Sequence, residues 1–411
     1  MSAYSCRPKW GSEPGVGWRF ATEIARRHQV WALVDQSNQP FIERHPPASE
    51  NPRFLYHKVP LWPTCPEKSH LGIQLHYYLW QRTIASVAAS LHKEIGFDVV
   101  HHANWARCWM PSGLAELDVP FVWGPIGAAE GVPAGFLNGF GWRARLSERL
   151  RNAARRVACL DPALRRTARR AAVALVTTGE TREKVVSLGV RHTAQMGTVG
   201  FSEEELRDFR NLPAPDSSLF RAVCIGRLLH WKGFHLAIRG FARFHRQWPR
   251  SELWIVNDGP EEGRLKELAR TESAAEAVRF WGKLPSVEDV YAKLANCRVL
   301  IHPALHETFG VACTEAMASG RPVICLDVGG PATQVTSDSG FRVSSSSQEA
   351  AIQGIADALE QLYKDPTLCA RLGEGARERV AAEFSSDALT SRIDALYEDV
   401  VRSGNKSRGL Q

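Results

Sequence analysis

The chain has 411 residues, of which 44% are hydrophobic and 23% are charged, and its formal net charge is +7. This length exceeds a single hydrophobic core and predicts two domains of about 150–200 residues each. No apolar run approaches the roughly 20 residues that cross a bilayer, and no basic-then-apolar leader opens the chain. The nine cysteines are scattered, which favours a reducing, cytoplasmic location.

The first part of the chain predicts a strand, a glycine-rich loop and a helix. The strand covers residues 2–6, the loop covers residues 11–18 (G-S-E-P-G-V-G-W), and residues 20–27 have helical spacing. Glycines at such a turn let the backbone approach a ligand closely. The loop lacks the G-x-G-x-x-G pattern of dinucleotide-binding folds. Met1 falls almost within the strand, so either the strand is short or the start assigned to the chain is several residues late.

Two histidines end a later strand of this half. Residues 97–102 (F-D-V-V-H-H) form a buried strand that follows a helix predicted over residues 71–91. Open α/β sheets bind ligands at the carboxyl ends of their strands, so His101 and His102 are candidates to meet a substrate. Because adjacent residues of a strand face opposite sides, we expect at most one of them to reach the site. A hydrogen-bonded pair of core histidines is the alternative.

An arginine-rich segment follows the strand predicted over residues 120–123. Between residues 142 and 170, ten arginines accompany only Glu148 and Asp161. Such a segment is typical of helices that lie on an anionic membrane surface, and equally of a solvated pair of charged helices. Nucleic acid is the least favoured partner, because no binding motif accompanies the charge.

A second alternation of strands and helices starts after a weakly periodic segment, residues 197–217, which we take as the domain boundary. Its first strand leads into the loop at residues 226–233 (G-R-L-L-H-W-K-G) and then into a helix. Arg227 and Lys232 place two cations beside a helix N-terminus, where they suit a departing diphosphate. Two solvated loop cations are the alternative.

The most informative segment spans residues 297–330. It reads in order as a strand, a loop, a helix and a strand: residues 297–302, 306–310, 311–319 and 321–326. Thr308 in the loop is expected to cap the helix, and the helix N-terminus suits a phosphate. Glu315 lies among small and apolar residues, where a carboxylate needs a specific partner such as vicinal hydroxyls. Glu307 lies in the loop, where a solvated carboxylate is the alternative. The segment therefore predicts a pocket for a sugar nucleotide.

Several other chemistries lack their motifs. No His/Cys cluster indicates a protein-bound metal. Neither a G-x-S-x-G elbow nor a G-x-x-x-x-G-K-[ST] loop occurs, which argues against a hydrolase triad and a P-loop kinase.

Taken together, these motifs resemble the retaining glycosyltransferases of family 4 (glycosyl transferases group 1), and the resemblance covers nearly the whole chain. Its most specific part is E-x7-E at Glu307 and Glu315, followed by A-S-G-R-P-V-I. The G-R-x-x-x-x-K-G loop matches the donor-diphosphate clamp of the family. The stretches G-S-E-P-G-V-G-W and W-G-P-I-G are similar to a bacterial subgroup often found with polysaccharide synthesis genes.

The resemblance implies an α/β protein of the GT-B fold, in which two doubly wound Rossmann-like domains face a central cleft. Residues 1–200 would bind the acceptor, residues 201–384 would bind the nucleotide sugar, and residues 385–411 would form a helix that packs back on the first domain.

The resemblance also implies roles for individual residues. Glu315 would hold the donor ribose and Glu307 would lie by the transferred sugar. The other implied donor-site residues are Arg227 and Lys232 at the diphosphate, Phe309 and Gly310 in the phosphate loop, Gly15 and Gly17 near the diphosphate and acceptor, and the turn at Gly259, which helps to choose the sugar.

The strand-end histidine of the family falls at His101 or His102. The usual D-V-V-H-x-H spacing is broken, because Ala103 takes the place of the second histidine. The choice between the two histidines therefore stays open.

The implied activity is that of a hexosyltransferase that moves a sugar from a UDP- or GDP-sugar to a hydroxyl of a glycan, lipid-linked or small-molecule acceptor. It would retain the anomeric configuration and need neither a metal nor a tightly bound cofactor. We expect it in the cytoplasm, peripheral on the inner face of the membrane through residues 142–170. A GT-B epimerase and a non-catalytic nucleotide-sugar-binding protein are the alternatives.

Overall fold

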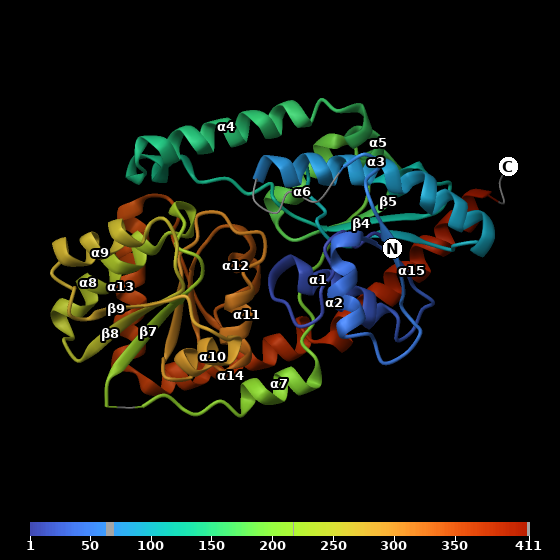
Figure 1. Ribbon diagram of the computed structural model, residues 1–411. Helices are drawn as coiled ribbons and strands as arrows, with labels where there is room; N and C mark the ends of the chain where they lie inside the picture. The colour runs from blue at the N-terminus through green and yellow to red at the C-terminus, as the bar shows by residue number, and fades with distance from the viewer. Residues whose placement is uncertain (63–69, 217, 409–411) are drawn as a thin grey trace. The chain divides into compact units, whose positions relative to one another are not determined.

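A computed structural model describes residues 1–62, 70–216 and 218–408, which form two compact α/β units (Figure 1). Unit 1 comprises Met1–Ala129, Ala153–Gly200 and Ser386–Gln411, and unit 2 comprises Glu130–Asn152 and Phe201–Ser385. Residues 130–152 therefore belong to the second unit, although they precede the boundary expected near residue 200. Among the described residues, none of the helices combines the length and apolar character that a membrane span requires.

Unit 1 is built on parallel strands. Its larger sheet has the order β3 (Val100–His102), β4 (Phe121–Ile126), β5 (Ala171–Val176) and β6 (Thr193–Gln195), and β1 (Trp31–Asp35) pairs with β2 (Arg53–His57). The predicted strand at residues 2–6 is reduced to single bridges, in which Ser2 pairs with both Leu33 and His102. These bridges place the first residues of the chain between β1 and β3.

The helices of unit 1 include the last helix of the chain. They are α1 (Ser12–Ile24), α2 (Gln39–Arg44), α3 (His70–Ile95), α5 (Pro162–Arg170), α6 (Gly179–Leu188) and α15 (Ser386–Arg408). Helix α15 packs against α1, and Asp394 of α15 lies within hydrogen-bonding distance of His28, at 2.7 Å. The predicted return of the C-terminal helix to the first domain is therefore confirmed.

The predicted glycine-rich loop is mostly helix, because α1 already begins at Ser12. Gly15 and Gly17 serve close packing. A Cβ atom at Gly15 would lie 2.0 Å from the Trp10 carbonyl oxygen, and one at Gly17 would lie 2.2 Å from the Ser5 carbonyl oxygen. The expectation of a loop failed because glycine has low helix propensity, whereas here tertiary contact demands a residue without a side chain.

Unit 2 is a six-stranded parallel sheet with a topological switch point at its centre. Its strand order is β12 (Gly340–Val343), β11 (Val323–Leu326), β10 (Val299–His302), β7 (Phe220–Ile225), β8 (Ser251–Val256) and β9 (Val278–Gly282). From β7 the chain winds outward through β8 and β9, and from β10 it winds the other way. Open sheets of this kind bind ligands beyond the carboxyl ends of the two central strands, here β7 and β10.

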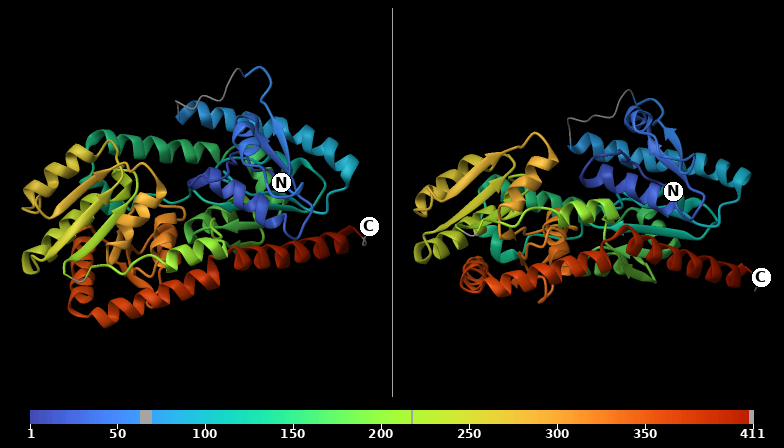
Figure 2. Two further views of the ribbon diagram at one scale, coloured as in Figure 1. Left: turned by 60° about the horizontal axis from the view of Figure 1, so that its bottom comes forward. Right: turned by 90° about the horizontal axis from the view of Figure 1, so that it is seen from below.

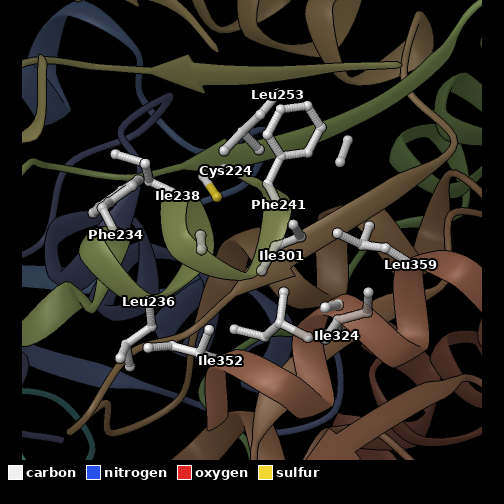
Figure 3. Close-up of a cluster of buried hydrophobic side chains, with 14 of the residues drawn as sticks. Cys224, Phe234, Leu236, Ile238, Phe241, Leu253, Ile301, Ile324, Ile352 and Leu359 are labelled. Carbon is white, nitrogen blue, oxygen red and sulfur yellow. The ribbon is translucent and has the colours of Figure 1, made fainter. Parts of the chain in front are cut away.

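Helices cover both faces of this sheet (Figures 1 and 2). They are α7 (Glu203–Arg210), α8 (Phe234–Gln247), α9 (Glu262–Thr271), α10 (Val287–Ala295), α11 (Val311–Ala318), α12 (Gly329–Gln334), α13 (Gln348–Lys364) and α14 (Pro366–Glu383). Helix α8 packs with α13, and α11 packs with α14. Figure 3 shows Phe241 of α8 and Leu359 of α13 in the core with Ile301 of β10. Helix α4 (Trp142–Ala158) begins in unit 2 and ends in unit 1.

Candidate functional site

Two loops meet beyond the carboxyl ends of β7 and β10. The first contains a 3₁₀ turn, His230–Lys232, and ends at Gly233, which has φ +71°. A Cβ atom at Gly233 would lie 1.9 Å from the Pro303 carbonyl oxygen. The Leu305 amide donates a hydrogen bond to the Trp231 carbonyl oxygen, at 2.8 Å. The loops therefore touch through their backbones, and only glycine fits at the contact.

This contact brings together two residues that the sequence pattern treated separately. The Lys232 ammonium donates a hydrogen bond to the Glu307 carboxylate. Burial raises the pKa of Glu307, but Lys232 and His302 lower it by more than burial raises it. The pKa of Glu307 therefore lies well below its usual range. Both side chains keep 20% of their surface exposed, so an ionised pair is accessible at the switch point.

His302 at the end of β10 is a site residue that sequence reasoning missed. Its Nε2 atom lies 3.5 Å from a Glu307 carboxylate oxygen. Burial lowers the pKa of the imidazole, although the hydrogen bond to Glu307 acts in the opposite direction. The signal in the sequence was its place as the last residue of a buried strand, the same signal that singled out His101 and His102.

The turn that contains Gly259 packs on the loop of Lys232. The Leu228 amide donates to the Asp258 carbonyl oxygen, at 2.8 Å, and a Cβ atom at Gly259 would lie 2.5 Å from the Leu228 carbonyl oxygen. Arg227, at the start of the Lys232 loop, is exposed. The structure thus brings Arg227, Lys232 and Gly259 to one end of the sheet, while their roles toward a donor stay predictions.

Glu315 lies on α11, the helix that follows the Glu307 loop. The Tyr291 hydroxyl of α10 donates to its carboxylate, at 3.0 Å, and the Tyr291 ring packs edge-on against Phe209, at 4.8 Å. Glu315 is partly exposed, and a carboxylate offers about four acceptor positions on its two oxygens. Tyr291 is therefore a second residue that the sequence did not reveal.

The N-terminus of α11 has no side-chain cap. Its N-cap residue is Gly310, at φ +87°. The expectation that Thr308 caps this helix is wrong, because the Thr308 hydroxyl instead donates to the buried Glu130 carboxylate, at 3.2 Å. Without a side chain over the first turn, the amides of α11 suit an anionic ligand.

Phe309 and Gly330, in the first turn of α12, fix the shape of the Glu307 loop. The Phe309 ring is 5% exposed and packs edge-on against Phe384, at 5.7 Å, so this side chain anchors the loop. The Gly330 amide donates to the Glu307 carbonyl oxygen, at 2.7 Å. A Cβ atom at Gly330 would lie 2.5 Å from the Phe309 Cα atom, so a side chain there would displace the loop.

His101 and His102, both in unit 1, are buried on opposite faces of β3. His101 Nε2 lies 2.6 Å from the Gly124 carbonyl oxygen and its Nδ1 lies 2.6 Å from the Tyr397 hydroxyl. His102 Nε2 lies 2.8 Å from the Tyr77 hydroxyl. Burial lowers the pKa of His101 to about 3 and that of His102 to about 4. Both rings are therefore neutral near pH 7 and hydrogen-bonded inside the unit.

Gly15 and Gly17 also lie in unit 1, in the first turns of α1. Asn104, two residues after β3, donates from its side chain to the Glu13 carbonyl oxygen, at 2.7 Å, and accepts from the Ser5 amide, at 3.1 Å. The start of α1 is thereby tied to the carboxyl end of β3.

In the part of the chain that the structure describes, no group of three or more His, Cys, Asp or Glu side chains is arranged to hold a metal ion.

The fold of the chain is similar to that of several solved structures over nearly its whole length. It is similar to sucrose-phosphate synthase from Thermosynechococcus elongatus (TM-score 0.64, 18% identity, 98% of both chains). It is also similar to Anabaena Alr3699/HepE in complex with UDP (TM-score 0.62, 18% identity, 95% of this chain and 98% of the other), and to WaaG, a glycosyltransferase of lipopolysaccharide biosynthesis (TM-score 0.58, 18% identity, 97% and 98%). The predicted GT-B fold is confirmed.

The second unit contains a match to a known family. Residues 207–379 match the family described as Glycosyl transferases group 1. Over 173 residues the chain is 30% identical to glycogen synthase from Mycobacterium tuberculosis, covering 42% of this chain and 41% of that protein. It is 29% identical over 179 residues to the lipopolysaccharide core biosynthesis glycosyltransferase LpsD from Rhizobium meliloti, covering 44% and 49%. The chain thus spans about half or less of the length of the curated relatives it matches.

Proposed function

We propose that this chain is a retaining glycosyltransferase that moves a hexose from a nucleoside-diphosphate sugar to a hydroxyl of a glycan, lipid-linked or small-molecule acceptor. The observation that carries the proposal is the accessible Lys232–Glu307 pair at the switch point of unit 2. Glu315 and the uncapped N-terminus of α11 follow within the same glycosyl transferases group 1 domain.

Each group has a task in this reaction. Lys232 and the first amides of α11 stabilise the diphosphate, which gains a negative charge as the anomeric C–O bond breaks. Glu315 accepts hydrogen bonds from the ribose hydroxyls. Glu307 orients the transferred sugar. The acceptor oxygen forms its bond to the anomeric carbon on the face that the phosphate leaves, and its proton passes to the leaving phosphate oxygen, so that no protein nucleophile is required.

The charges of the site support a mechanism without a metal. Arg227 and Lys232 supply positive charge at the end of β7, where a metal-dependent transferase would place a cation. The Gly259 turn and the Glu307 loop lie beside this charge and choose the sugar.

We take a UDP-sugar as the first donor to test, with a GDP-sugar as the alternative. Alr3699/HepE, which shares the fold, has been solved in complex with UDP-glucose. A donor should raise the melting temperature of the chain, because a ligand at 100 times its Kd adds about 2.7 kcal/mol to the free energy of unfolding. A thermal-shift series with UDP, GDP and their sugars, followed by product analysis, measures this.

The same series separates the alternatives. Sugar transfer to an acceptor extract supports the proposal. Interconversion of the nucleotide sugars without an acceptor would indicate an epimerase, and binding without turnover would indicate a non-catalytic protein. No shift with any nucleotide or nucleotide sugar would contradict the proposed function.

We further propose that the chain works in the cytoplasm as a peripheral protein on an anionic membrane surface, which residues 142–170 contact. Large apolar side chains of α4 are exposed among its arginines: Trp142 (70%), Leu146 (48%), Leu150 (61%) and Val157 (67%). An apolar face flanked by arginine is suited to the headgroup region of anionic lipids.

Membrane binding is tested by co-sedimentation with vesicles. Vesicles that contain phosphatidylserine should bind the chain. Salt should weaken this binding, because at 0.1 M ionic strength exposed charges more than about 10 Å apart are largely screened from one another. The double variant Leu146→Ser, Leu150→Ser should bind several-fold more weakly. Equal binding to neutral and anionic vesicles would contradict this part of the proposal.

A further inference from the structure

The segment at residues 130–152 is built into unit 2, although it lies in the first half of the sequence. Phe136 and Phe140 are buried in the core of unit 2, at 0% and 3% exposure. The buried Glu130 carboxylate accepts a hydrogen bond from Thr308. The segment therefore reaches the Glu307 loop. Its last residues, 142–152, form the first part of α4.

Glu148 of α4 is a buried carboxylate, 2% exposed, surrounded by donors. One carboxylate oxygen lies 3.1 Å from His230 Nε2 and 3.9 Å from His306 Nε2. The other accepts from the Arg151 guanidinium, which also contacts His306. Burial raises the pKa of Glu148, but the two imidazoles and Arg151 outweigh burial and lower it to about 2. Glu148 is thus ionised and engaged on both oxygens.

The partners of Glu148 belong to the two loops of the candidate site. His230 lies two residues before Lys232 in the same 3₁₀ turn, and His306 immediately precedes Glu307. The His306 ring stacks on the Trp231 ring, with centroids 5.3 Å apart and planes at 17°. Glu148 therefore joins the same two loops that Lys232 and Glu307 join.

We propose that Glu148 is a positioning residue of the donor site, which holds the loop at residues 226–233 against the loop at residues 303–310. The role rests on the proposed function. Neither loop has a regular ladder of hydrogen bonds to fix it, and each presents a charged side chain that must keep its place when the diphosphate arrives. A buried carboxylate that pairs with His230 in one loop, and that holds Arg151 against His306 in the other, supplies this constraint. Losing its charge leaves buried donors unsatisfied.

The test is Glu148→Gln, which keeps the size and removes the charge. We expect the Kd for the nucleoside diphosphate, measured by calorimetry, and the KM for the donor to rise about tenfold, as for loss of a hydrogen bond to a charged group. The KM for the acceptor should not change. Glu148→Asp, which keeps the charge, should recover part of the loss. Glu349→Gln, which removes an exposed partner of Arg243 in the same unit, is the matched control and should bind as the wild type does.

Two outcomes contradict the role of Glu148: an unchanged Kd in Glu148→Gln, or an equal rise of the donor and acceptor KM values, which indicates a disturbance that is not specific to the donor site. If Glu148→Gln does not fold, His306→Phe decides, because it keeps a ring over Trp231 and removes the nitrogen that faces Glu148. An unchanged Kd in that variant rejects the proposal. A wild-type chain that binds no nucleoside diphosphate contradicts the proposed function itself, and the role with it.

Discussion

Replacement of Lys232 by methionine should lower kcat by about 100- to 1,000-fold, the range seen when one preorganised stabiliser of transition-state charge is removed. The substitution keeps the aliphatic stem of the side chain and removes the ammonium that faces Glu307. Under the proposed function, the diphosphate would then depart without the positive charge assigned to it. Glu307 also loses the strongest interaction that lowers its pKa. Initial rates with a saturating donor measure the effect.

The control for this experiment is Lys266→Met. Lys266 is an exposed lysine of α9 in the same unit, where it pairs with Glu262, and its loss should leave kcat at the wild-type value. Wild-type turnover in Lys232→Met would refute the assignment of Lys232 to the diphosphate.

Replacement of Glu315 by glutamine should raise the donor KM and the Kd for the nucleoside diphosphate by about 10- to 100-fold. Hydrogen bonds from sugar hydroxyls to a carboxylate contribute about 1.5–3 kcal/mol, and an amide oxygen without charge accepts them more weakly. The acceptor KM should stay the same. Calorimetry with the nucleoside diphosphate and initial-rate kinetics separate the two constants.

Glu288→Gln provides the comparison for Glu315→Gln, since Glu288 is an exposed carboxylate in the first turn of α10. A Glu315→Gln variant with the nucleotide affinity of the wild type would remove Glu315 from the ribose site. Equal losses in both variants would point to an effect of net charge in place of a direct contact.

The regular elements of unit 2 followed from the sequence because local and tertiary preferences agree there. The short apolar run that ends at His302 predicted a strand buried on both faces, and β10 lies at the centre of the parallel sheet. Small residues at helical spacing followed by Gly320 predicted α11 to within one residue at its end. Each of these signals is contained in at most ten consecutive residues.

The errors arose where a local signal competed with a distant partner. Thr308 was expected to cap the next helix, but its hydroxyl instead donates a hydrogen bond to Glu130, which lies 178 positions away in the sequence. The glycines at residues 15 and 17 were expected in a loop, but they allow α1 to touch the backbone at residues 5 and 10. Residues 130–152 were expected in the first domain, because position along the chain was the only guide.

The sequence by itself therefore determined the alternation of strands and helices, and the residue types of the candidate site with their spacing within each loop. Hydrophobic periodicity and turn chemistry act over a few residues, so they can be read without coordinates. Only the tertiary structure decided that Lys232 meets Glu307, that Tyr291 meets Glu315, and that Glu148 joins the two loops. These contacts depend on which strands become neighbours at the switch point, and the long-range packing of the core settles that order.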